Sequence, residues 1–175
     1  PFVSVLERLM DTECPTIAAV DGAVRAGGIG LMASCDLVVV NSATTFALTE
    51  VRIGVAAAII SVPILLRVPA GKIATAMLTG EVFGAAEARS IGLVTHVSDD
   101  VAGTVASLLD GVRAGAPRAV SETKALLRRV PTLPRSDAFA EMAALSNDLF
   151  AGPDAQIGMQ AFRDKQRPDW DRRET

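Results

Sequence analysis

Short apolar runs alternate with turns along the first third of the sequence, and this pattern predicts strands joined by a glycine-rich connection. The run at 16–20 predicts a strand, a turn follows at 21–22, and the run at 36–40 predicts a second strand. Between them, a glycine step at 26–30 leads directly into an apolar segment, 31–35, which we expect to be helical. A strand, a glycine turn and a helix in this order expose backbone N–H groups at the helix start, where they suit an oxyanion.

Helical periodicity dominates the rest of the chain. One helix is expected to begin near 57, in an apolar run that ends at 68. The others are expected at 2–11, 72–78, 83–90, 100–114, 116–129, 136–149 and 154–165. A short strand is expected at 93–97, Pro63 is expected to break the run that ends at 68, and Ser136 is a candidate cap. We therefore expect a strand-and-helix core at 1–97 and a helical region at 98–175.

Composition excludes several classes of function. Hydrophobic residues make up 50% of the 175 residues and charged residues 21%, which favours a folded core over disorder. A net charge of −3 gives no electrostatic basis for binding nucleic acid, and no apolar run is long enough to predict a membrane span. Cys14 and Cys35, in apolar surroundings, are expected to be buried free thiols of a cytoplasmic protein. His96 is the only histidine, so no metal site is expected.

The residues at 15–50 carry a resemblance to a known family. They read PTIAAVDGAVRAGGIGLMASCD at 15–36 and F-x-x-x-E at 46–50; LTG, AAEA and IGLV follow in order, and the chain closes with GMQAFRDKQRP. Over nearly its whole length the sequence resembles the crotonase (enoyl-CoA hydratase/isomerase) family. The resemblance implies an α/β fold, a crotonase-like ββα spiral core with a C-terminal helical trimerisation region. It also implies that residues preceding Pro1 carry further strands and half of the oxyanion hole.

Two positions match catalytic positions of the family. Gly27 matches the glycine whose backbone N–H polarises the thioester carbonyl, although GGIG alone also fits a tight turn before a helix. Glu50 matches the glutamate that exchanges a proton at the α-carbon; the alternative is a solvated acid at a helix start. Ala26 and Gly28 flank Gly27 and are expected to contact the substrate.

Gly30 departs from the family pattern, because the first catalytic glutamate of the two-glutamate hydratases falls at this position. Glycine has no side chain that could activate water, so a two-glutamate mechanism is not expected. The block LTEVRIGVAAAIIS at 48–61 resembles the single-glutamate branch typified by methylglutaconyl-CoA and isohexenylglutaconyl-CoA hydratases, although Ala57 stands where proline is common.

Three further residues are candidate coenzyme A contacts. Arg25 could meet a CoA phosphate or a substrate carboxylate, or be a solvated loop cation. Phe162 and Lys165 match family positions that reach the CoA adenine and phosphate, often from a neighbouring subunit; the alternative is an amphipathic helix with a core phenylalanine and a solvated lysine.

The resemblance predicts an enzyme that adds water to an α,β-unsaturated acyl-CoA. A Δ-isomerase that uses one glutamate and a non-catalytic acyl-CoA-binding homologue remain as alternatives. The expected partners are the acyl-CoA substrate and further copies of the chain, as a homotrimer or a hexamer built as a dimer of trimers. No cofactor is expected beyond coenzyme A as part of the substrate, and the acyl chain and the pathway of lipid or amino-acid metabolism stay open.

Overall fold

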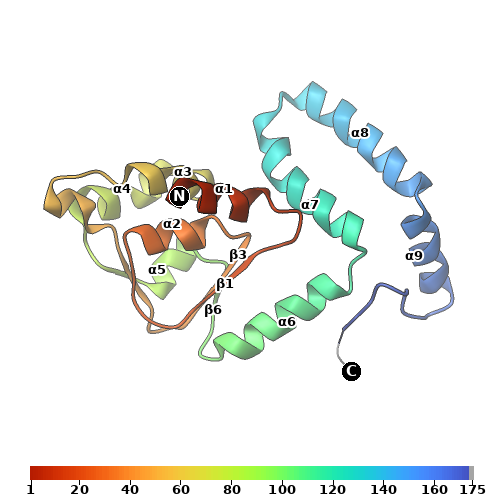
Figure 1. The fold of residues 1–175 in the computed structure, drawn as a ribbon, viewed down its shortest axis with the longest axis horizontal. Helices are drawn as coiled ribbons and strands as arrows, with labels where there is room; N and C mark the ends of the chain where they lie inside the picture. Colours follow the sequence, from red (N-terminus) through yellow and green to blue (C-terminus); the bar gives the residue numbers. More distant parts are fainter. Residues whose placement is uncertain (174–175) are drawn as a thin grey trace. The chain divides into compact units, whose positions relative to one another are not determined.

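The computed structural model describes residues 1–173 and divides the chain into two compact units. The first runs from Pro1 to Ser107 and the second begins at Leu108. The division lies inside helix α6 (Val101–Arg113), C-terminal to the boundary after Val97 that the sequence suggests. Figure 1 follows the chain through both units.

The strands of the first unit form two small sheets through which the chain winds. The strands are β1 (Ile17–Val20), β2 (Val24–Arg25), β3 (Leu37–Val40), β4 (Thr45–Ala47), β5 (Phe83–Gly84) and β6 (His96–Val97). One sheet has the order β1-β3-β6 and is parallel; the other has the order β2-β4-β5, with β2 and β4 parallel and β4 and β5 antiparallel. Along the chain, the pairs β1 and β2, β3 and β4, and β5 and β6 each place one strand in each sheet. The backbone therefore follows a spiral.

Helices connect these strands and cover them. They are α1 (Phe2–Asp11), α2 (Gly27–Ala33), the 3-10 helix η1 (Thr49–Ile53), α3 (Ala58–Arg67), α4 (Ala70–Thr79) and α5 (Ala85–Ser90). Gly80 ends α4 with φ +68, a left-handed conformation that glycine adopts without strain. Figure 1 shows α1, α2 and α3 close together on one side of the strands.

The core of the first unit is built around strand β3. Its residues Val38, Val39 and Val40 are fully buried because β3 pairs with a strand on each side. Phe46 of β4 and Phe83 of β5 stack with their ring centroids 5.3 Å apart, which joins the second sheet to this core.

Two charged side chains hold α2 and the sheet together. The Asp36 carboxylate accepts hydrogen bonds from the Thr16 N–H at 2.7 Å and the Thr16 hydroxyl at 3.0 Å, which fixes the start of β1 against β3. The Arg67 guanidinium donates to the carbonyls of Ala33, Cys35 and Asp36, so the C-terminal end of α3 caps the C-terminal end of α2.

Several boundaries expected from the sequence are wrong. Helix α2 begins within the glycine step, at Gly27, because its glycines pack closely enough to form the first turn. The segment 83–84 is strand β5 rather than the start of a helix, and the strand expected at 93–97 is reduced to β6. Cys14 is exposed and Cys35 is half-buried, so the expectation that both thiols are buried is wrong.

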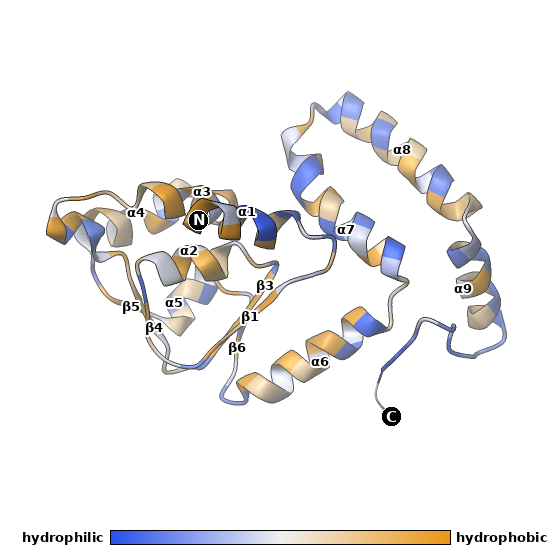
Figure 2. Ribbon diagram, in the orientation of Figure 1, coloured by the Kyte–Doolittle hydropathy of each residue, from blue (hydrophilic) through white to orange (hydrophobic). Residues whose placement is uncertain are grey.

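Helix α3 continues through Pro63 instead of breaking there. Ile60, Pro63 and Ile64 share the buried face, and this apolar stripe compensates for the backbone hydrogen bond that proline cannot donate. Figure 2 colours α3 as mainly hydrophobic. Its exposed side is also apolar, with Leu66 70% exposed.

The second unit is helical. After the end of α6 it contains α7 (Pro117–Arg129), η2 (Val130–Thr132), α8 (Arg135–Ala151) and α9 (Pro153–Arg163). Ion pairs between Arg118 and Asp148 and between Arg129 and Glu141 join α7 to α8 as an antiparallel hairpin. The hydrogen bond from Arg129 lowers the pKa of Glu141. Helix α8 begins after Pro134, so Ser136 is not its cap.

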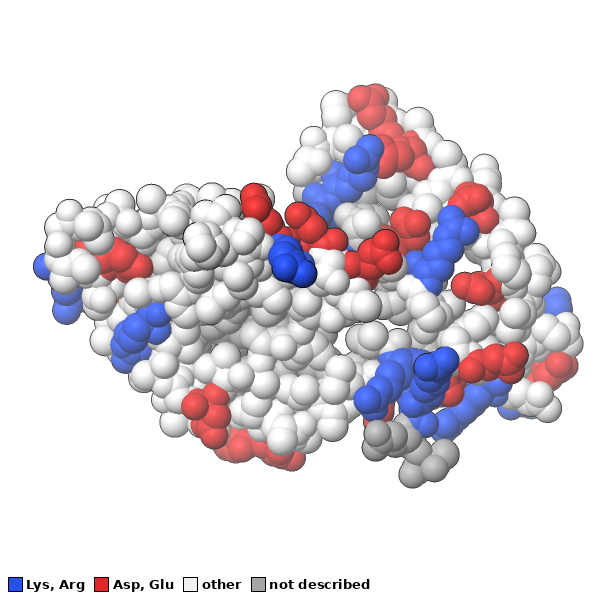
Figure 3. Space-filling view, in the orientation of Figure 1, with Lys and Arg blue, Asp and Glu red and all other residues white. Residues whose placement is uncertain are grey.

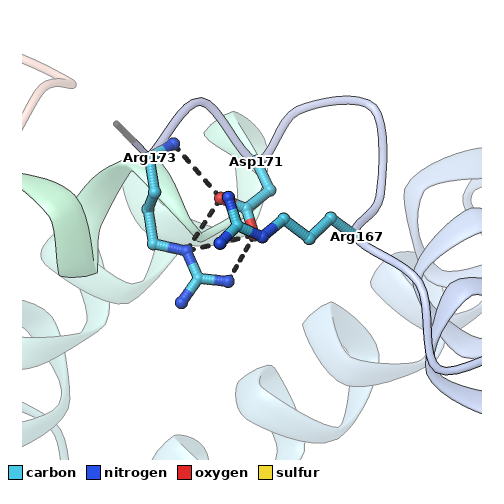
Figure 4. Close-up of polar contacts among 3 residues, drawn as sticks. All are labelled: Arg167, Asp171 and Arg173. Carbon is cyan, nitrogen blue, oxygen red and sulfur yellow. Dashed lines mark hydrogen bonds and ion pairs between the residues drawn. The ribbon is translucent and has the colours of Figure 1, made fainter. Parts of the chain in front are cut away.

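The C-terminal segment of the second unit is held by ion pairs around Asp171. Arg173 donates to both carboxylate oxygens of Asp171, with Nη2 at 2.5 Å from Oδ2, and Arg167 lies 3.9 Å away (Figure 4). The hydrogen bond from Arg173 is the largest cause that lowers the pKa of Asp171, to about 2. The Arg172 N–H also donates to the Arg113 carbonyl at the end of α6.

On the face drawn in Figure 3, the charges form no large field of one sign. In the view of Figure 3 the first unit shows few charged groups, and on the second unit basic and acidic groups alternate. This distribution fits the small net charge of −3 and offers no basic stripe for a polyanion in this view. No helix within residues 1–173 has the length and apolar character that a membrane crossing requires.

Candidate active site

Paired strands bring the two candidate catalytic positions to one edge of a sheet. β2 and β4 are parallel, with Arg25 paired to Ala47, so their C-terminal ends point the same way. The glycine step leaves β2 at this end and Glu50 follows β4 at the same end. The Ala26 N–H donates to the Ala47 carbonyl at 3.2 Å and extends the pairing by one bond. The topology therefore places the turn before Gly27 beside the turn that carries Glu50.

A strained residue sets the direction of the glycine step. Ala26 has φ +47 and ψ −122, a conformation that residues with a Cβ rarely adopt. Immediately after it, Gly27 and Gly28 begin α2, where the first N–H groups have no acceptor within the helix. Ile29 donates its N–H to the Ala26 carbonyl at 2.9 Å. The N–H groups of Gly27 and Gly28 are therefore the ones in this turn that a ligand can use.

Apolar side chains crowd both of these glycines. A Cβ placed on Gly27 would lie 3.4 Å from Cζ of Phe2, at the start of α1, and one placed on Gly28 would lie 3.1 Å from Cγ1 of Val24. Glycine at these positions lets the ring and the methyl group approach the backbone. The turn is thus packed against apolar groups on the side where a Cβ would stand.

The Glu50 side chain lies in η1, directly after β4. The residue is half-buried, and its Oε2 atom is buried without a hydrogen-bond partner in the described chain. Buried carboxylate oxygens are normally hydrogen-bonded, and an unpartnered one is a common feature of a site that awaits a ligand. Glu50 is therefore not a fully solvated acid, and its role as a catalytic acid or base stays a prediction.

Gly30 is closed off by helix α3. A Cβ at this position would lie 2.4 Å from Cγ2 and 2.7 Å from Cβ of Ile60, distances that real side chains do not reach. Both residues are buried, and Ile60 belongs to the buried stripe of α3. The position of the absent first glutamate is thus a close contact between two helices, with no room for any side chain.

Arg25 is already engaged within the fold. Its guanidinium donates to the Thr45 carbonyl at 2.6 Å, the Thr45 hydroxyl at 3.0 Å and the Val24 carbonyl at 2.9 Å. These bonds tie β2 to the start of β4 and support a structural role. A contact with coenzyme A stays a prediction.

The two C-terminal candidates lie in the second unit. Phe162 is 86% exposed on α9, and Lys165 follows the end of that helix at Arg163 with φ +54. Phe162 is therefore not a core residue of an amphipathic helix within the described chain. Contacts of either residue with coenzyme A stay predictions.

A cavity is also present in the second unit. It has a volume of about 590 Å³ and is lined by residues of the second unit, among them Arg118, Phe150, Met159 and Trp170. Neither Gly27 nor Glu50 lines it. Within residues 1–173 no group of His, Cys, Asp and Glu side chains is arranged to hold a metal ion.

Sequence reasoning missed three features of this site. Ile60 opposite Gly30 and the bond from Arg52 of η1 to Thr79 of α4 depend on distances between elements that no local pattern encodes. The positive φ of Ala26 contradicts the usual preference for glycine. The only local indication of this conformation in the sequence is the position of Ala26 directly before two glycines.

Comparison with known proteins places this geometry in a family. The sequence profile of the enoyl-CoA hydratase/isomerase family matches residues 1–173. A Thermus thermophilus protein provisionally named an enoyl-CoA hydratase is 38% identical over 158 residues, which cover 88% of this chain and 62% of the relative. Enoyl-CoA hydratase EchA19 of Mycobacterium tuberculosis is 30% identical over 166 residues, which cover 91% of this chain and 61% of the relative.

Solved structures agree with the sequence comparison. An enoyl-CoA hydratase of Mycobacterium smegmatis matches with a TM-score of 0.90 and 27% identity, over 97% of this chain and 66% of that structure. The expected crotonase-like fold with a C-terminal helical region is thereby confirmed. The chain spans 62% and 61% of the two relatives named above. Profile, identity and fold agree: the chain belongs to the enoyl-CoA hydratase/isomerase, or crotonase, family.

Proposed function

We propose that the whole protein is an enoyl-CoA hydratase that adds water to an α,β-unsaturated acyl-CoA thioester. The proposal rests on the positions of Gly27 and Glu50, which follow the C-terminal ends of two paired parallel strands, and on the Glu50 Oε2 atom, which is buried and unpartnered. Relatives that carry the name enoyl-CoA hydratase support the same reaction class.

The proposed mechanism uses one carboxylate. The Gly27 N–H donates to the thioester oxygen, where negative charge develops as water adds to the β-carbon and an enolate forms; one such donor is worth about 3 kcal/mol. Glu50 accepts a proton from the attacking water and delivers it to the α-carbon, so the carboxylate ends as it began. Gly28 and Ala26 supply the backbone beside the carbonyl.

A double-bond isomerase is the second candidate, and the closed position at Gly30 favours it. An isomerase needs one group that removes a proton from one carbon and returns it to another, and a carboxylate at Glu50 suffices. Ile60 leaves no room at Gly30 for a second carboxylate that would hold water. A non-catalytic acyl-CoA-binding protein is the third possibility.

For the substrate we propose an acyl group of the methylglutaconyl type, on the resemblance of the segment 48–61. For the assembly we propose a cytoplasmic homotrimer or a hexamer of two trimers. Aromatic side chains exposed on the second unit, Phe139 at 73%, Phe150 at 64% and Phe162 at 86%, support contacts between copies. A monomer mass in sedimentation equilibrium would refute this assembly.

Turnover by the full-length protein tests the reaction. Crotonyl-CoA and methylglutaconyl-CoA are supplied in turn, and products are identified by mass beside the Glu50→Gln variant. We expect a gain of one water that disappears in the variant. The matched control is Glu87→Gln, which changes an exposed glutamate on α5 and should leave turnover intact.

Each result selects one candidate. A product of unchanged mass with a shifted double bond identifies the isomerase. Binding of coenzyme A without turnover of either substrate supports the non-catalytic alternative. Undiminished hydration by Glu50→Gln would remove Glu50 from the mechanism.

A further inference from the structure

The turn that carries Glu50 has little packing of its own. None of the residues of η1 is buried, and those at 51–54 are all exposed. The backbone hydrogen bonds that close this turn are local. They run from the Gly54 N–H to the Val51 carbonyl at 3.4 Å and from the Val55 N–H to the Glu50 carbonyl at 3.2 Å. Such a turn opens readily unless another element holds it.

One side chain of η1 reaches a neighbouring helix. Arg52 donates from Nε to the carbonyl of Thr79, the last residue of α4, at 2.9 Å. Among residues 1–173, no other side-chain hydrogen bond joins η1 to a different element. The bond satisfies one of the carbonyls that a helix end leaves without an intrahelical partner.

Gly80 makes this contact possible. It follows Thr79 with φ +68, and a Cβ at Gly80 would lie 2.9 Å from Nε and 3.3 Å from Cδ of Arg52. The Arg52 side chain therefore lies directly over the glycine that ends α4. Helix α4 is a firm support, because Ile73 is 1% exposed and packs in the core of the first unit.

We propose that Arg52 is a positioning residue that holds the Glu50 turn against the end of α4. Arg52 does not touch the substrate in this proposal; it fixes the backbone from which the carboxylate extends. The claim about catalysis rests on the proposed function of Glu50, whereas the claim that Arg52 holds η1 does not. Lysine carries the charge but lacks the planar Nε–H, so it should replace Arg52 only in part.

Two variants test the contact from its two sides. Arg52→Ala removes the donor, and Gly80→Ala leaves the donor but places a methyl group against it. Arg89→Ala, which removes an exposed arginine of α5, is the control for loss of charge. Gly92→Ala is the control for backbone strain, since Gly92 has φ +89 and its added Cβ would meet the nearest atom only at 3.8 Å.

Hydrogen exchange of the Val55 amide reports whether η1 is closed, because this N–H bonds to the Glu50 carbonyl. We expect exchange about tenfold faster in Arg52→Ala and Gly80→Ala, the loss expected for one hydrogen bond to a charged group, with a smaller change in Arg52→Lys. The two controls should match the wild type. An unchanged Val55 exchange rate in Arg52→Ala would overturn the proposal whether or not the protein turns over acyl-CoA.

Kinetics test the consequence for catalysis. If the protein is a hydratase or an isomerase, Arg52→Ala should lower kcat about tenfold with KM nearly unchanged, because Glu50 is displaced while the binding surface remains. A rise in KM at constant kcat would instead make Arg52 a binding residue and refute the positioning role. Absence of turnover in the wild type refutes the proposed function alone, since the exchange result stands apart from it.

Discussion

Adding one methyl group at Gly30 should destabilise the first unit. The added Cβ would lie 2.4 Å from Cγ2 of Ile60 and 2.7 Å from its Cβ, and 3.4 Å from its Cα. The Cγ2 contact can be relieved by a rotation of the Ile60 side chain, but the Cβ contact cannot, because that atom is fixed to the backbone. Helix α3 must therefore retreat from α2 by several tenths of an ångström.

The free energy of unfolding should fall by up to about 2 kcal/mol in Gly30→Ala. Overpacking of a well-packed site costs about 1–3 kcal/mol. Alanine offsets part of this, since it is about 1 kcal/mol better than glycine inside a helix. The matched control is Gly71→Ala in α4, where nothing lies within 4 Å of the added Cβ, so only the helix gain remains and stability should rise.

Urea unfolding followed by far-UV circular dichroism measures the change. The single tryptophan, Trp170, belongs to the second unit, so its fluorescence serves as an internal reference that Gly30→Ala should leave unchanged. Ile60→Ala alone should cost about 2–5 kcal/mol through the cavity it leaves. In that background Gly30→Ala should cost about 1 kcal/mol less than in the wild type, because the cavity accepts the new methyl group.

Strict additivity of the two substitutions would refute the reasoning. It would mean that Gly30 and Ile60 do not share the space that their distances indicate. A Gly30→Ala variant as stable as Gly71→Ala would have the same meaning.

Two further predictions concern the strained turn and the C-terminal ion pairs. Ala26→Gly should raise the free energy of unfolding by about 1 kcal/mol, because relief of positive-φ strain exceeds the entropy that glycine adds to the unfolded chain. The control is Ala23→Gly in the preceding turn, which has no positive φ and should lower the free energy of unfolding. The same result for both variants in urea unfolding would contradict the argument. Since Arg173 lowers the pKa of Asp171 to about 2, below its usual value near 4, the stabilisation should be complete above about pH 4 and be lost as pH falls toward 2. Fluorescence of Trp170 between pH 5 and pH 2 should report this loss, and an Asp171→Asn variant with the same pH dependence would show that another group is responsible.

Local patterns were sufficient for the elements around the site. Short apolar runs predicted strands at 16–20 and 36–40, and helical spacing predicted a helix at 2–11. The structure has the strands at Ile17–Val20 and Leu37–Val40 and the helix at Phe2–Asp11. The family resemblance added what spacing cannot supply, the roles of Gly27 and Glu50. Their placement at one sheet edge then followed from the parallel pairing of β2 with β4, a pairing that the sequence did not predict.

The elements that sequence reasoning misjudged are those decided by packing. Proline in the middle of an apolar run favours a break, yet the buried stripe of Ile60, Pro63 and Ile64 keeps α3 continuous. Glycine-rich sequence favours a loop, yet Gly27 and Gly30 are helical, and Gly30 packs directly against Ile60 of α3. In both cases tertiary contacts outweigh a local preference of about 1–3 kcal/mol.

The absent first glutamate is therefore a property of the packing as well as of one residue. Restoring a carboxylate by Gly30→Glu would force Cβ into Ile60 before the carboxylate could reach any substrate. A second acid would require α3 to begin farther from α2, which involves the whole segment from Ala57 onward. In the proposed mechanism Glu50 therefore carries the proton transfer alone, and in our proposal Arg52 holds its turn, in which no residue is buried. On these two proposals, the packing that closes Gly30 makes the placement of the Glu50 turn decisive for the chemistry.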